Sequence, residues 1–181
     1  FCFTFFDTPQ SFYDFVIIVS FYYLDSDLMP ADVQLGKNEY LLWTNYYGNA
    51  SAEMISFIEK KFRGRLIVDN CHAFYCLPLT EAFNCYSARK FIGVADGAYL
   101  VSNNDIDINI EGLKEDQSKP FMEHLYKQIK EGTNEGYPLN LANEKRLEKN
   151  YGLMSETSEE ILKKVDYQKI KNIRIKNFSK I

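Results

Sequence analysis

The sequence has no excess of positive charge and no long hydrophobic run. Its 21 lysines and arginines are outnumbered by 25 aspartates and glutamates, which gives a net charge of -4. This balance favours neither nucleic acid nor a membrane as a partner. The longest apolar stretch near the amino end, residues 15–23, is too short to span a bilayer. The first 36 residues contain no lysine or arginine and so lack the basic start of a signal peptide. We therefore expect a cytoplasmic protein.

Cysteine is scarce, and the four cysteines form no familiar pattern. The sequence contains no CxxC and no HxxxH motif. A zinc site could be imagined from four side chains, Cys71, His72, Cys76 and Cys85. Their spacings match no common structural zinc pattern. Without a secretory signal, free thiols are the expected state. We therefore predict no metal and mostly buried thiols.

The composition indicates one folded domain with a core rich in aromatic rings. Of the 181 residues, 46% are hydrophobic and 15% are aromatic, which excludes a disordered tail, a collagen-like chain and a coiled coil. The first half alternates between strand and helix patterns. We expect a short helix over 9–15, strands over 16–23, 40–44 and 65–69, and a helix that begins at Ser51 and ends at Gly64. Strand, helix and strand in this order form a βαβ unit with parallel strands.

The second half is more charged and mainly helical. A strand over 98–102 follows the pair Asp96-Gly97, which favours a tight reversal and an antiparallel strand. Further helices are expected from Pro120 and from the capping-box pattern that starts at Thr157. Residues 166–178 can form another helix or continue the one from Thr157. The fold prediction is therefore α/β, with a mostly parallel sheet and flanking helices. We divide the chain into an α/β part over 1–103 and a helical segment over 104–181.

Three polar residues follow the predicted parallel strands. Asp69 ends an otherwise apolar strand, and ligands of open α/β sheets bind at the carboxyl ends of strands. The alternative is that Asp69 caps a helix beginning at Asn70. His72 can face the same cleft, although an isolated histidine is more often a satisfied core residue. Asn45 ends the preceding strand, where it can equally be a turn residue.

Lys90 is the most informative lysine of the chain. It follows a strand-like segment that contains Ser87 and precedes the apolar run 91–94. Most lysines are solvated surface groups. A lysine enclosed by apolar segments loses its proton more easily and can attack a carbonyl group to form a Schiff base. Together with Asn45, Asp69 and His72, these residues are of the kinds that pyridoxal phosphate requires.

Three segments resemble the large domain of fold-type I pyridoxal-phosphate enzymes, and most closely the DegT/DnrJ-type sugar aminotransferases. The segments read NYYG over 45–48, LIVDNCH over 66–72 and YSARKFIGVADGAYL over 86–100. Residues 174–178 are similar to the family's long helix between the large and small domains. The family's serine commonly lies five positions before the lysine, where this chain has Cys85. The resemblance covers about 40–100 well and the remainder loosely.

The resemblance implies a role for each candidate residue. Lys90 would bind pyridoxal 5'-phosphate as a Schiff base, and Asp69 would pair with the ring nitrogen. His72 would contact the ring hydroxyl or stack near it, Ser87 would bind the phosphate, and Asn45 would lie near the cofactor. The implied activity is transamination of a nucleotide-linked keto sugar by an amino donor, in a homodimer.

The resemblance also implies segments that the sequence lacks. The family's glycine-rich phosphate loop and its small domain have no counterpart here, so the chain looks like the central part of the large domain and can be inactive alone. Two other interpretations stay open. The chain can be a non-catalytic remnant that kept the fold, or an α/β domain that binds some other small molecule through Asp69 and His72.

Overall fold

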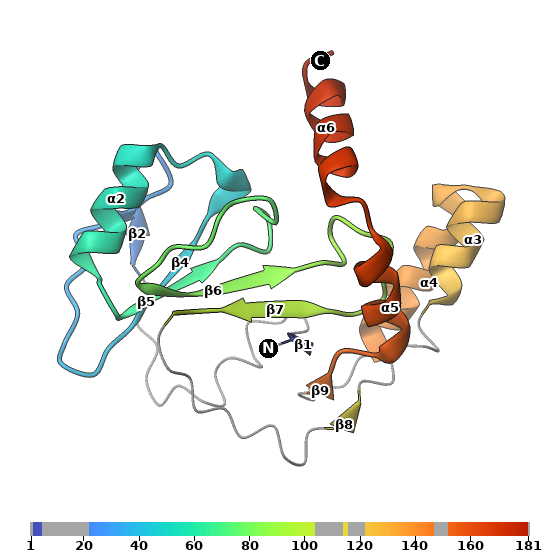
Figure 1. Ribbon diagram of the computed structural model, residues 1–181, viewed down its shortest axis with the longest axis horizontal. Helices are drawn as coiled ribbons and strands as arrows, with labels where there is room; N and C mark the ends of the chain where they lie inside the picture. Colours follow the sequence, from blue (N-terminus) through green and yellow to red (C-terminus); the bar gives the residue numbers. More distant parts are fainter. Residues whose placement is uncertain (1, 5–21, 104–113, 116–121, 147–151, 181) are drawn as a thin grey trace.

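The fold is known from a computed structural model, which describes residues 2–4, 22–103, 114–115, 122–146 and 152–180. The expected helix over 9–15 and most of the expected strand over 16–23 lie outside these residues. The described elements, drawn in Figure 1, are β1 (Cys2–Thr4), β2 (Tyr23–Leu24), β3 (Pro30–Ala31), β4 (Leu41–Thr44), the 3-10 turn η1 (Tyr46–Gly48), α2 (Ala52–Lys61), β5 (Leu66–Asp69), β6 (Ala82–Ser87), β7 (Ala98–Val101), β8 (Lys114–Glu115), α3 (Glu123–Glu131), α4 (Thr133–Arg146), β9 (Gly152–Leu153), α5 (Glu156–Lys164) and α6 (Tyr167–Phe178).

The main sheet of the described chain is mixed, with the strand order β4-β5-β6-β7-β1-β9-β8. β4, β5 and β6 are parallel, as expected for the βαβ unit, whereas β7 is antiparallel to β6, and β1 is antiparallel to β7 and β9. The α/β class is thus confirmed, but the sheet is not mostly parallel beyond β6. β7 returns through residues 88–97, a connection without the crossover helix that a parallel strand usually needs.

The expected direction of β7 is confirmed, but the reversal is wider than a tight turn at Asp96-Gly97. It occupies the whole connection 88–97, and the Ala88 N–H donates to the Gly97 carbonyl across it at 3.1 Å. β9, which lies beyond the predicted boundary at residue 103, pairs with β1 in the main sheet.

α2 forms where the sequence predicts it, because both of its ends carry the right residues. The Ser51 hydroxyl accepts a hydrogen bond from the Met54 N–H at 3.3 Å and so caps the first turn. Ile58 is the buried residue of the helix and packs in a core cluster with Trp43 and Leu66. Gly64 has a φ of +69°, the left-handed conformation that often ends a helix.

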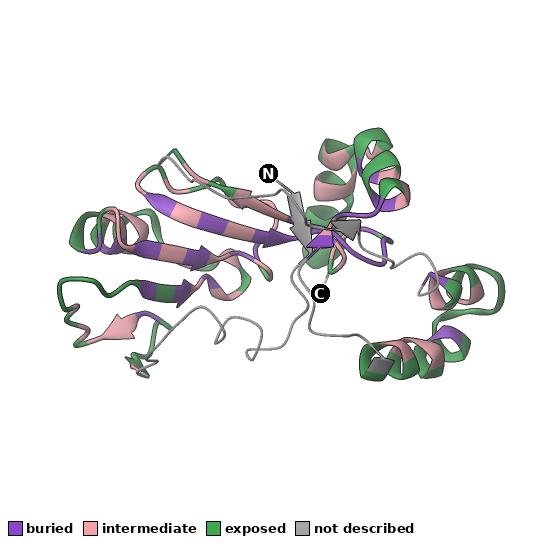
Figure 2. Cartoon of the chain, turned by 90° about the horizontal axis from the view of Figure 1, so that it is seen from below, coloured by how far each residue is buried: buried purple, intermediate pink, exposed green. Residues whose placement is uncertain are grey.

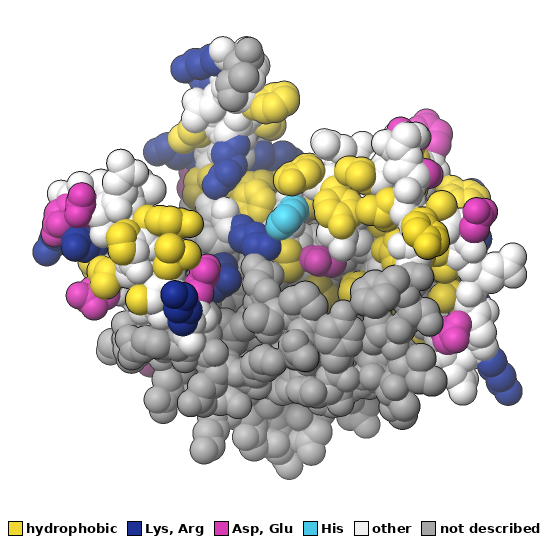
Figure 3. All heavy atoms as spheres, turned by 180° about the vertical axis from the view of Figure 1, so that it is seen from behind, with side chains coloured by type: hydrophobic (Ala, Val, Ile, Leu, Met, Phe, Trp, Pro, Cys, Tyr) yellow, Lys and Arg dark blue, Asp and Glu magenta, His cyan; other side chains and the backbone are white. Residues whose placement is uncertain are grey.

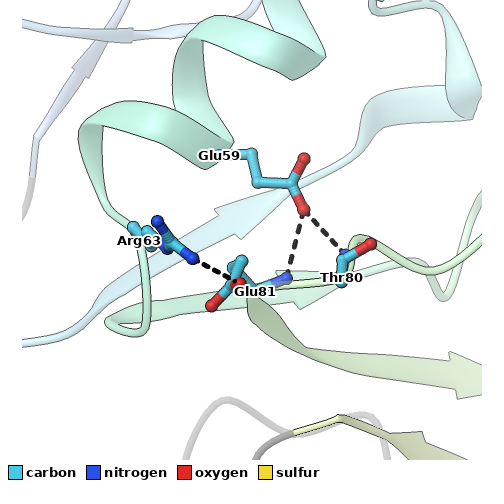
Figure 4. A network of polar contacts seen from close by, with 4 residues as sticks. All are labelled: Glu59, Arg63, Thr80 and Glu81. Atoms are coloured by element: carbon cyan, nitrogen blue, oxygen red, sulfur yellow. Dashed lines mark hydrogen bonds and ion pairs between the residues drawn. The ribbon is translucent and has the colours of Figure 1, made fainter.

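A side chain of α2 also fixes the start of β6. The Glu59 carboxylate accepts hydrogen bonds from the backbone N–H groups of Thr80 and Glu81 at 2.7 and 3.1 Å, and Arg63 pairs with the Glu81 carboxylate at 2.9 Å (Figure 4). β5 and β6 bury alternate residues, and Figure 2 shows these buried positions along the middle of the sheet. Glu59 and Arg63 thus attach α2 and the residues after it to the segment that leads into β6.

The helices after residue 122 differ in detail from the expected ones. The predicted start at Pro120 lies outside the described residues, and α3 begins at Glu123. The prediction of a capping box at Thr157 is wrong, because the N-cap of α5 is Ser155, two residues earlier in the chain. α6 is a separate helix capped by Asp166, and it projects away from the sheet in Figure 1.

Candidate functional site

The three parallel strands bring polar residues to one edge of the sheet. Asn45 follows β4, Asp69 ends β5 and Ser87 ends β6, so all three lie at the carboxyl edge. Backbone hydrogen bonds hold this edge together. The Asn45 N–H donates to the Asp69 carbonyl at 3.0 Å, and the Asn70 N–H donates to the Cys85 carbonyl at 2.8 Å. The structure thus places Asn45, Asp69 and Ser87 on the edge where α/β sheets bind ligands.

Asn45 and Asn70 form a buried pair of side-chain amides at this edge. They are 5% and 1% exposed, and Asn45 Nδ2 donates to Asn70 Oδ1 at 2.9 Å. Asn45 Oδ1 is also buried, and no residue in the described ranges donates to it. An unpaired buried acceptor costs about 1–3 kcal/mol. Asn45 Oδ1 is therefore the atom of this edge most in need of an outside hydrogen-bond donor.

Sequence reasoning missed Asn70, although its position directly after Asp69 was a usable signal. Asp69 itself is half-buried, and its Oδ1 accepts a hydrogen bond from the Cys71 N–H at 2.9 Å. Residues 70–76 form successive turns rather than a helix, so the alternative of a helix N-cap at Asp69 is wrong. The backbone thus holds the Asp69 carboxylate at this edge through Oδ1.

Cys85 lies beside Asp69 on the neighbouring strand and is half-buried. Cys85 is the partner of Asp69 in the β5–β6 ladder. Burial raises the pKa of this thiol to about 12, and the Asp69 carboxylate raises it further in the same direction. Cys85 therefore stays a neutral thiol at physiological pH and is not available as a nucleophile.

His72 lies on the surface, and its ring stacks on that of Tyr47. The two ring centroids are 5.6 Å apart with an interplanar angle of 25°, and both residues are exposed. His72 is therefore not the buried core histidine of the alternative interpretation. Tyr47 has a φ of +58° and is followed by Gly48 at +70°. A side chain at Gly48 would meet Cys76 Sγ at 2.7 Å, so this tight loop needs glycine where it touches the turns after β5.

Ser87 and Lys90 follow one another at the end of β6 but differ in exposure. Ser87 is 6% exposed and is paired with Ala98 of β7. Lys90 is exposed, so the expectation that apolar segments enclose it is not met. Its apolar neighbours Ala88 and Ile92 turn inward, and the Ile92 N–H donates to the Ala88 carbonyl at 2.9 Å. This turn leaves Lys90 on the outside.

An aromatic cluster supports the turn that carries Lys90. Phe74, which sequence reasoning did not single out, lies at its centre and stacks on Phe91 with 5.5 Å between ring centroids. The other rings around Phe74 come from four separate segments: Tyr75, Tyr86, Tyr99 and Tyr167. The cluster therefore joins the turns after β5, the strands β6 and β7, and α6.

Comparisons with protein-family models, curated proteins and solved structures find no match to this chain. Within the described ranges, no three His, Cys, Asp or Glu side chains gather as a metal site would require. None of the described helices has the length and apolar character to cross a membrane. A hollow of about 310 Å³ lies between α2 and the β2–β3 hairpin, and none of the predicted site residues lines it.

Proposed function

We propose that this chain is part of the large domain of a fold-type I pyridoxal-phosphate enzyme that transaminates a nucleotide-linked keto sugar. The observation that carries the proposal is the polar carboxyl edge of β4, β5 and β6, where Asn45 Oδ1 is buried and unpaired by described residues. The order of segments along the chain, which resembles the DegT/DnrJ-type family, supports the same conclusion. The family's substrates, its homodimer and its cytoplasmic location belong to this proposal.

The residues at the edge fit the chemistry of the cofactor. Pyridoxal phosphate, when bound, supplies a ring that withdraws electrons from the carbon being changed. Asp69 offers a half-buried carboxylate at the end of β5, suited to a protonated ring nitrogen. Asn45 Oδ1 can accept a hydrogen bond from a hydroxyl group. Ser87 would bind a phosphate oxygen, and His72, with Tyr47 behind it, would contact the ring.

Lys90 would hold the cofactor through its amine and, once released, would move a proton at the substrate carbon. Lys90 is exposed, so burial is not the means by which its amine would be activated. The same exposure favours a second candidate function, a non-catalytic α/β domain that binds a small molecule at the carboxyl edge. The two candidates differ in whether Lys90 forms a covalent bond to the cofactor.

The test is reduction with borohydride after incubation with pyridoxal phosphate, followed by peptide mapping. The proposal expects the label at Lys90, with little at Lys60 and Lys61, which lie exposed on α2 and serve as internal controls. Equal labelling of all three lysines would reject a specific site and leave the binding-domain interpretation.

Asp69→Asn tests the second part of the site. Asn can still accept the hydrogen bond from the Cys71 N–H, so the free energy of unfolding should change by less than about 1 kcal/mol. An amide cannot keep a ring nitrogen protonated, so transfer of the amino group from a donor, measured in the full-length protein, should slow at least about tenfold. An unchanged rate would exclude the cofactor role of Asp69.

A further inference from the structure

An arginine of α6 contacts the turn after β6, beside the apolar packing of Tyr167 and Ile170 in the cluster that contains Ala88 and Ile92. Arg174 Nη2 donates a hydrogen bond to the Phe91 carbonyl at 3.1 Å. The guanidinium carbon also lies 5.0 Å from the centre of the Phe91 ring, within the range of a cation–π interaction. The two residues are 83 positions apart in the sequence. Arg174 therefore holds both the backbone and the side chain of a single distant residue.

Phe91 is the residue through which this contact can act on Lys90. The N–H groups of Phe91 and Ile92 both donate to the Ala88 carbonyl at 2.9 Å, which closes the turn with Lys90 at its centre. The Phe91 ring stacks on Phe74 and so cannot shift without disturbing the aromatic cluster. Because Lys90 precedes Phe91 directly, holding the Phe91 backbone and ring limits where the Lys90 Cα can lie.

We propose that Arg174 is a positioning residue that fixes the turn 88–92 and thereby the backbone position from which the Lys90 side chain extends. The inference rests on the proposed function of Lys90 and adds a residue from α6 to it. α6 carries several lysines and projects from the body, and basic side chains surround it in Figure 3. Among these basic residues, Arg174 contacts the turn twice, through the Phe91 carbonyl and through the Phe91 ring.

The experiment compares Arg174→Met and Arg174→Lys with Lys176→Met, a control on the exposed part of the same helix. Hydrogen exchange of the Phe91 and Ile92 amides measures how firmly the turn is held. In Arg174→Met both amides should exchange about fivefold faster than in the control, because one stabilising contact has been lost. Arg174→Lys keeps the charge and should recover part of the protection.

A second readout separates positioning from general loosening. Labelling of Lys90 by pyridoxal phosphate and borohydride should fall about fivefold in Arg174→Met, to match the lost protection. Reductive methylation of the same amine by formaldehyde, which requires only access, should not fall. Circular dichroism establishes whether each variant is folded. If Arg174→Met does not fold, the same two measurements are made on Arg174→Lys.

Three results would overturn the inference or its basis. Equal exchange in Arg174→Met and Lys176→Met would show that Arg174 does not hold the turn. Faster exchange with unchanged labelling of Lys90 by pyridoxal phosphate would show that the turn does not position the amine. Absence of Lys90 labelling in the unaltered protein would instead reject the proposed function, while the exchange rates would still decide whether Arg174 holds the turn.

Discussion

Replacement of Asp96 by alanine should be among the most destabilising changes in this chain. Asp96 is 1% exposed, and its carboxylate accepts three hydrogen bonds at the start of α5. The Ser155 N–H donates to Oδ2 at 2.7 Å, the Ser155 hydroxyl donates to Oδ1 at 2.8 Å, and the Ser158 hydroxyl also donates to Oδ1. Both serines are buried, so water cannot readily replace the carboxylate.

The magnitude follows from what each donor can do after the carboxylate is removed. The Ser155 N–H is fixed by the backbone and loses a buried hydrogen bond to a charged acceptor, at a cost of about 2 kcal/mol. The hydroxyls of Ser155 and Ser158 can rotate toward other acceptors, so each loses about 1 kcal/mol. Asp96→Ala should therefore lower the free energy of unfolding by about 4 kcal/mol. Asp96→Asn keeps one acceptor for the N–H and should cost about half as much.

The assay is urea unfolding followed by circular dichroism and by the fluorescence of Trp43, the single tryptophan. Asp166→Ala is the matched control, because Asp166 also caps a helix by accepting from the Lys169 N–H at 2.9 Å, but it is exposed. The control should lose about 1 kcal/mol. If Asp96→Ala cost no more than Asp166→Ala, the reasoning from buried donors would be refuted.

Three further outcomes are expected. Burial raises the pKa of Cys85 to about 12, so about one molecule in ten thousand carries its thiolate at pH 8. A maleimide should therefore modify Cys85 only after the protein is unfolded, and modification of Cys85 in the native protein at pH 8 would contradict this. Burial also raises the pKa values of Tyr22 and Tyr86 to about 12, so the folded state holds these protons more tightly. Their contribution to stability should be complete below pH 10 and decline toward pH 12, as urea unfolding at pH 9 and pH 11 would measure; equal stability at both would contradict it. Ser51→Ala should cost about 1 kcal/mol through loss of the α2 cap, and Ser51→Gly should recover most of it.

The parts of the fold that the sequence predicted are those set by neighbouring residues. β4, α2 and β5 follow from an apolar run, a serine cap, a helical stripe and Gly64, all within about 30 residues. The same local pattern placed Asn45 and Asp69 at strand ends, because parallel strands in a βαβ unit share a carboxyl edge. For these residues the position in the fold required no knowledge of distant contacts.

The errors concern contacts between distant segments. The N-cap of α5 is Ser155 rather than Thr157 because Asp96, 59 positions earlier, accepts from both the backbone and the hydroxyl of Ser155. Local pattern cannot supply that partner. Lys90 was expected to be enclosed because apolar residues flank it in sequence, but the turn directs Ala88 and Ile92 inward and leaves the lysine outside. Adjacent residues in a turn do not share an environment.

The two long-range contacts hold opposite ends of one short segment. Asp96 ties the end of the connection 88–97 to α5, and Phe91 ties its beginning to α6. The sheet fixes where this connection starts and stops, through Ser87 and Ala98, but not its path between them. The position of Lys90 relative to Asp69 therefore depends on helices that lie more than 50 residues later in the chain. A substitution at the junction of α5 and α6 should therefore change the position of the Lys90 amine and leave the carboxyl edge of the sheet unchanged.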